Sequence, residues 1–203
     1  MCQKTLSRTL LTAALAATAL TSNTGAANTP SRADAASLRQ KVAVITAFSE
    51  RPQRQANRTT LTEDEVNAFL VYEAGDQLPA GVVDPAISIE GTGRVSGRAV
   101  VDLDAVRRQK SSRGFLDPLS YAGGRLPVTA AGVLSTGNGV GRFELQSATM
   151  AGIPIPKTLL QEIVSYYSRT PENPAGISLD DSFPLPARIR EIQTDVGRVV
   201  VIQ

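Results

Sequence analysis

The sequence predicts an α+β fold in which a long curved antiparallel sheet, a meander, wraps around two or three short amphipathic helices. Between Gly75 and Gly141 the chain places 12 of its 16 glycines among residues that alternate between apolar and polar. This period of two is typical of antiparallel strands separated by turns and bulges. Two other segments, 63–74 and 156–167, repeat their apolar residues every three or four positions, as amphipathic helices do.

The first 27 residues have the features of a secretory signal peptide. Lys4 and Arg8 precede an apolar run from Leu10 to Leu20, and Gly25-Ala26-Ala27 offers a cleavage site, with a second at Ala33-Asp34-Ala35. A transmembrane helix needs roughly 20 apolar residues, and this run is shorter. We therefore expect cleavage after residue 27, or as late as 35, a secreted or periplasmic protein, and no stable transmembrane anchor.

Composition argues against an enzyme and against a metal or another cofactor. The chain has no histidine and no tryptophan, and Cys2 lies within the leader. General acid–base catalysis most often recruits histidine, and transition metals bind imidazole and thiolate. Removing Lys4 and Arg8 leaves 19 basic against 19 acidic residues, so the mature chain is formally neutral. We expect no nucleic-acid partner and read the basic run 107–110 as a solvated loop.

Residues 28–60 are predicted to be a linker that contains a short helix. The helix is indicated by the spacing of Leu38, Val42, Ile45 and Phe48. Residues 61–203 are predicted to form a single α+β domain.

The helix predicted over 63–74 has a complete start signal. Thr62 and Glu65 have the spacing of a capping box, and Val66, Phe69 and Leu70 form one apolar face. The acidic run 63–65 could also be a catalytic or calcium-binding cluster. Acidic residues in a first turn are explained better by the helix dipole.

The predicted strands place their apolar residues on one face. Ile87 and Ile89 share a face, and so do Val95, Ala99, Val101 and Leu103. Gly91-Thr92-Gly93 between these two sets is either a hairpin turn or a bulge in one long strand.

Asn138-Gly139, within the turn 136–139, is the clearest hairpin signal. Either register of this turn puts Ala130 and Gly132 on the same face as Phe143, Leu145 and Ser147. The small residues leave room for close approach of a helix or of a ligand.

The second strong helix, 156–167, begins after a proline pair, and its apolar stripe contains Leu159, Leu160, Ile163, Val164 and Tyr167. Two strands, 183–193 and 198–202, end the chain.

Four motifs occur in a fixed order: the capped Leu-Thr-Glu-Asp-Glu-Val-Asn-Ala-Phe-Leu helix at 61–70, the meander, Gly-x-Pro-x-Pro at 152–156, and Leu185-Pro186-x-x-Ile189-x-x-Ile192 followed by Gly197 and 199–202. This series, which covers residues 61–203, resembles the bacterial extracytoplasmic YpmS-like and LmeA-like families, related to tubular lipid-binding (TULIP-like) domains. The resemblance implies an elongated apolar groove for acyl chains, and lipid binding or transfer in the cell envelope.

The sequence therefore predicts a non-enzymatic envelope protein that binds a lipid or another apolar ligand in a groove between sheet and helices. The alternative is a structural or partner-binding envelope protein with a filled core and no ligand. The residues expected to line the groove are Phe69, Leu70, Ile87, Ile89, Ala130, Gly132, Phe143, Leu145, Leu160, Ile163 and Val164.

Overall fold

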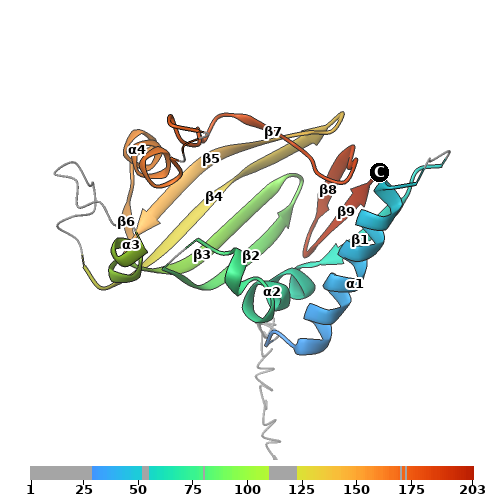
Figure 1. Cartoon of the computed structure of the whole chain (residues 1–203), viewed down its shortest axis with the longest axis horizontal. Coiled ribbons are helices and arrows are strands. Elements are labelled where there is room, and N and C mark those ends of the chain that lie inside the picture. The colour runs from blue at the N-terminus through green and yellow to red at the C-terminus, as the bar shows by residue number, and fades with distance from the viewer. Residues whose placement is uncertain (1–28, 52–54, 80, 110–122, 170, 172) are drawn as a thin grey trace, which may run out of the picture.

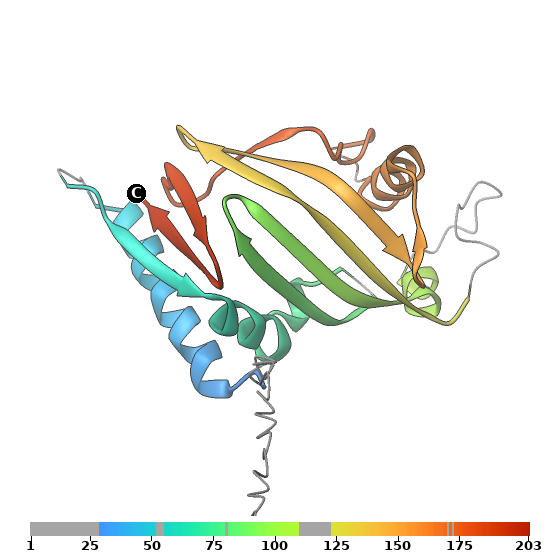
Figure 2. The same cartoon turned by 180° about the vertical axis from the view of Figure 1, so that it is seen from behind.

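A computed structural model describes residues 29–51, 55–79, 81–109, 123–169, 171 and 173–203. In these residues the chain forms two antiparallel sheets and four α-helices, where the sequence predicts two or three helices. Both views place the three-stranded sheet and α1 at one end of the molecule, and α3 and α4 at the other (Figures 1 and 2). The signal-peptide residues 1–27 and most of the loop 107–124 lie outside the described residues.

The larger sheet confirms the predicted antiparallel meander. Its strands follow chain order, and β7 adds to the outer edge of β5. The strands are β2 (Val82–Gly91), β3 (Arg94–Asp102), β4 (Arg125–Gly137), β5 (Val140–Met150), β6 (Ile153–Pro154) and β7 (Ser182–Pro184).

Two hairpin turns settle alternatives that the sequence left open. Gly91 pairs with Arg94, so Thr92-Gly93 is the loop of a hairpin between β2 and β3, and residues 91–93 are not a bulge in one long strand. Gly137 pairs with Val140, which makes Asn138-Gly139 the two-residue loop. Asn138 and Gly139 have φ of 52° and 80°, the left-handed values that a type I′ turn requires.

A smaller sheet brings the two ends of the described chain together. Its strand order is β1 (Arg58–Thr62), β9 (Arg198–Ile202) and β8 (Glu191–Asp195). A bridge between Glu90 and Val196 joins it to the larger sheet, and the Gly197 amide donates to Ile89 O at 2.8 Å.

The region expected to be a linker contains the longest helix in the described residues, α1 (Arg32–Ser49). Ala35, Leu38 and Ile45 of α1 are buried, and the helix packs against α2 and β1. β1 also crosses the boundary that the sequence suggests at residue 61. Residues 32–49 and 58–62 therefore belong to the same packed body as the rest.

The main core lies between α1 and the three-stranded sheet. It is a cluster of Ile45, Leu185, Ile189 and Val201, flanked by Leu61, Ala187 and Ile192. Few residues of the larger sheet are buried, and nearly all of them are half-buried or exposed. The two ends of the molecule therefore differ in how completely their apolar residues are covered.

α2 (Glu63–Tyr72) closes the free edge of β2. The predicted capping box is present, with Thr62 Oγ1 accepting from the Glu65 amide and Glu65 Oε2 accepting from the Thr62 amide. Asn67 accepts from the Ile87 amide at 2.7 Å and donates to Ile87 O at 2.9 Å. These bonds satisfy backbone groups that an edge strand would otherwise expose.

The remaining helices are η1 (Gly75–Gln77), α3 (Leu103–Gln109) and α4 (Lys157–Tyr167). Among the described residues, no helix is both long enough and apolar enough to cross a membrane.

Candidate binding groove

The pairing of strands assigns each residue of the larger sheet to one of two faces. Residues directly opposite in antiparallel strands project to the same face. One row runs Gly97–Ala130–Ala148, and a second, two residues further along, runs Ala99–Val128–Met150. We call the side that carries these rows the apolar face. The intervening row, Arg98–Thr129–Thr149, lies on the opposite side, the polar face.

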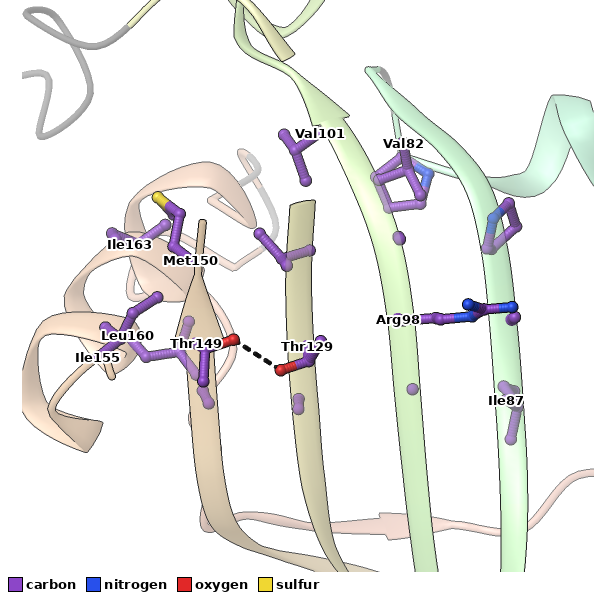
Figure 3. A pocket seen from close by; sticks show the side chains of 18 of the residues that line it. Val82, Ile87, Arg98, Val101, Thr129, Thr149, Met150, Ile155, Leu160 and Ile163 are labelled. Carbon is purple, nitrogen blue, oxygen red and sulfur yellow. Dashed lines mark hydrogen bonds between the residues drawn. The ribbon is translucent and has the colours of Figure 1, made fainter. Parts of the chain in front are cut away.

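A groove of about 540 Å³ lies over the apolar face. Strands β2, β3, β4 and β5 form its floor. One wall is formed by Ile155 and by Leu160 and Ile163 of α4, which lie beside β5 in Figure 3, whereas Val82 and Ile87 lie on β2 across the floor. The remaining wall residues are Leu70 of α2, Pro79, and Leu103 and Val106 of α3.

The floor of the groove is open at Gly97. Among the described residues other than its chain neighbours, only Ala86 O, at 3.8 Å, would lie within 4 Å of a Cβ atom at this position. The row Gly97–Ala130–Ala148 has no large side chain, so the described structure leaves room for a side chain at Gly97.

Toward the other end of the sheet, an aromatic ring lies against Gly132. A Cβ atom at Gly132 would lie 2.3 Å from Glu144 O and 2.6 Å from Phe143 Cζ. Phe143 thus occupies the space beside Gly132 that the sequence left open for a helix or a ligand. Ile89, in the same cross-strand row as Gly132, is only 4% exposed.

A bulge changes the face of Ser147. Ala131 pairs with Ser147, but Gly132 pairs with Leu145, so one extra residue of β5 lies between these pairs. Unbroken alternation predicts Ser147 on the same face as Phe143 and Leu145. Because a bulge reverses the alternation on one side of it, Ser147 lies on the polar face instead.

The structure brings together part of the residue set expected from the sequence. The expected residues that line the groove are Leu70, Ile87, Ala130, Leu160 and Ile163, and those that do not are Phe69, Ile89, Gly132, Phe143, Leu145 and Val164. Sequence reasoning missed several lining residues, including Gly97, Ala99, Val128, Ala148 and Met150. Alternation alone contains the signal for these residues, but the register between strands is needed to group them.

α4 forms a wall of the groove and does not fill it. Among the described elements α4 packs chiefly against β5. Leu160 and Ile163 border the groove, whereas Leu159 on another side of the helix is exposed. The sequence left room beside Ala130 for a helix or a ligand. α4 borders this space through Leu160 and Ile163 but does not fill it.

Charged side chains near this part of the sheet gather on the polar face. A second groove there, of about 740 Å³, is bordered by Glu63, Asp64, Asp84 and Arg98. Several serine and threonine residues also line it. Charge and hydroxyl groups are thus concentrated on the side of the sheet opposite the apolar groove.

Asp102, at the end of β3, has a structural role. Asp102 Oδ1 accepts from the Ala105 amide at 2.8 Å, and its other oxygen lies 3.4 Å from Arg125 Nε. The Ala105 amide lowers the pKa of Asp102, burial opposes this, and Arg125 adds to the lowering. Asp102 therefore helps to begin α3. Across the described residues, no group of three or more His, Cys, Asp or Glu side chains could hold a metal ion.

In comparisons with known proteins, no family model and no curated protein matches the chain. The resemblance to YpmS-like and LmeA-like proteins therefore stays a prediction from the order of its sequence motifs. The interpretation of the site rests on the geometry of the groove.

Proposed function

We propose that the protein binds a lipid or another apolar ligand in the groove over the apolar face, and that it does so without catalysing a reaction. The observation that carries this proposal is an unfilled space of about 540 Å³ bordered chiefly by apolar side chains. Ligand sites commonly have volumes of roughly 300–1,000 Å³ and predominantly apolar linings. With the leader at residues 1–27, we further propose that the protein acts outside the cytoplasm, in the cell envelope or the surrounding medium.

Exposed apolar surface gives a second candidate, a structural envelope protein that binds a protein partner. Ile153 is 70% exposed and Val196 is 75% exposed. Exposed apolar residues mark interaction surfaces when they form a contiguous patch, whereas isolated ones are ordinary. The open groove favours the ligand-binding candidate, because a purely structural protein has no need of empty volume beside its sheet.

Two neighbouring alanines provide a matched test of the groove. Ala130→Leu adds bulk to the floor, while Ala131→Leu makes the same change one residue further along β4, on the polar face. We expect the wild-type protein to retain lipid in native mass spectrometry and to bind a fluorescent fatty acid, 11-(dansylamino)undecanoic acid. Ala130→Leu should weaken this binding, and Ala131→Leu should not.

Each result bears on a different part of the proposal. A folded wild-type protein that neither retains lipid nor binds the probe would count against ligand binding and favour the structural candidate. Equal binding by both variants and the wild type would show that the ligand occupies another part of the molecule.

A further inference from the structure

The volume of the groove, about 540 Å³, is in the range of a site for one small-molecule ligand. The row Gly97–Ala130–Ala148 carries only small side chains, so a ligand chain lying in the groove would come closest to the sheet there.

We propose that the groove takes one hydrocarbon chain, with any polar head group outside, and that Gly97 sets the length of chain that the groove covers. This inference rests on the proposed function and names the ligand class for the same site. It would be wrong if the groove took a compact ring system or two chains.

The lining explains why the buried part of the ligand is hydrocarbon. Among the described residues at the border, Arg98, Thr129 and Thr149 are the polar ones, and strand pairing puts their row on the polar face. The hydroxyls of Thr129 and Thr149 also hydrogen-bond to each other at 2.7 Å. A carboxylate or phosphate placed over the apolar floor would lose its hydration, and the apolar side chains there offer it no hydrogen bond in return, which is unfavourable.

Gly97 controls the capacity because of its place in the floor. It lies on β3 between Ile87 of β2 and Ala130 of β4, all three of which line the groove. Its φ is outside the left-handed region, and a Cβ here meets only Ala86 O, at an ordinary contact distance. A larger residue can therefore replace Gly97 without backbone strain, and its side chain will project into the groove. The side chain of leucine has four carbons, so Gly97→Leu should remove room for about four ligand carbons.

The test is a chain-length series of lysophosphatidylcholines, each with a single saturated chain, titrated into the complete chain as secreted. Each buried methylene tightens binding by up to about fourfold, so affinity should rise with length until the chain fills the groove and then level off. Gly97→Leu should move this break about four carbons shorter. Ser96→Leu, the neighbouring position on the polar face, should leave the break in place.

The outcomes separate this inference from the proposed function. Binding by the wild type with no break in the series, with two chains per protein, or with tighter binding of cholesterol than of any single chain would overturn the one-chain inference alone. A break that stays in place in a folded Gly97→Leu protein would overturn the role of Gly97. If Gly97→Leu does not fold, Gly97→Ala replaces it, with an expected shift of about one carbon. Absence of binding by any probe to folded wild type would reject the proposed function itself.

Discussion

Glu65 joins α1 to α2 through a buried carboxylate, and its replacement by glutamine tests how much this connection stabilises the fold. Ser37 Oγ of α1 donates to the carboxylate at 2.6 Å, and Lys41 Nζ lies 2.7 Å from it. The same carboxylate accepts from the Thr62 amide at 2.9 Å, completing the capping box. A single side chain therefore links the start of α2 to two residues of α1.

The pKa of Glu65 gives the magnitude. Burial alone would raise this pKa, but hydrogen bonds from Lys41, Ser37 and Thr62, together with the charge of Lys41, lower it from 4.5 to about 2. A shift of this size corresponds to about 3 kcal/mol. Because the Glu65 side chain is only 9% exposed, solvent screens little of this. Glutamine keeps the shape of the side chain, but it replaces one acceptor oxygen by an NH₂ group that faces the donors of Lys41, Ser37 and Thr62. We therefore expect Glu65→Gln to lower the free energy of unfolding by about 2–3 kcal/mol at pH 7.

The dependence on pH has a definite sign. Because the folded-state pKa is lowered, the ionised carboxylate stabilises the fold fully above pH about 4.5 and loses this contribution as the pH falls toward about 2. Urea unfolding of wild type and Glu65→Gln at pH 7, 4 and 3 should show the difference between them shrinking with acidity.

The matched control is Glu73→Gln. Glu73 also pairs with α1, through Arg39 at 3.1 Å, but the Arg39 side chain is 64% exposed. This replacement should cost less than about 1 kcal/mol. Equal losses in the two variants, or a Glu65→Gln loss that does not change with pH, would refute the reasoning.

Three further predictions concern packing and export. Gly132→Leu should destabilise the protein by roughly 1–3 kcal/mol in urea unfolding, because its side chain meets Glu144 O and the Phe143 ring; unchanged stability would mean that Phe143 does not occupy that space. Ile45→Ala should cost about 2–5 kcal/mol because Ile45 is part of the main core, and a loss below about 1 kcal/mol would place that core elsewhere. The intact mass of protein recovered from the native host should lack the first 27 to 35 residues, and recovery of the full-length chain would contradict the expected cleavage.

Local signals predicted the local features well. The Thr62–Glu65 spacing gave the capping box, and Asn138-Gly139 gave the hairpin loop with both residues in the left-handed region. Each of these features is decided by neighbours in the sequence, through side-chain to backbone bonds or backbone conformation. Period-two alternation likewise predicted the antiparallel meander.

The candidate site was harder to predict because it depends on contacts between distant residues. Gly97 joins Ala130 and Ala148 in one row only through the register of three strands, and the bulge in β5 moves Ser147 to the opposite face. The extent of α1 was also underestimated, because residues 32–36 have no apolar period of their own. Ser31 caps this helix by accepting from the Asp34 amide, and Ala35 is buried by tertiary packing.

The separation of the main core from the groove explains how a sheet can keep an open apolar face in a folded protein. The cluster around Ile45 and Val201 buries its side chains against α1, at the end of the molecule away from α3 and α4 (Figure 1). Over the larger sheet, α2 is held at the edge of β2 by Asn67, and α4 lies beside β5, so neither helix covers the floor between them. Because stability and the open face depend on different contacts, Ile45→Ala should lower stability and leave the chain-length break unchanged. Gly97→Leu should move the break with little loss of stability, and a large stability loss from Gly97→Leu would mean that the floor is part of the core.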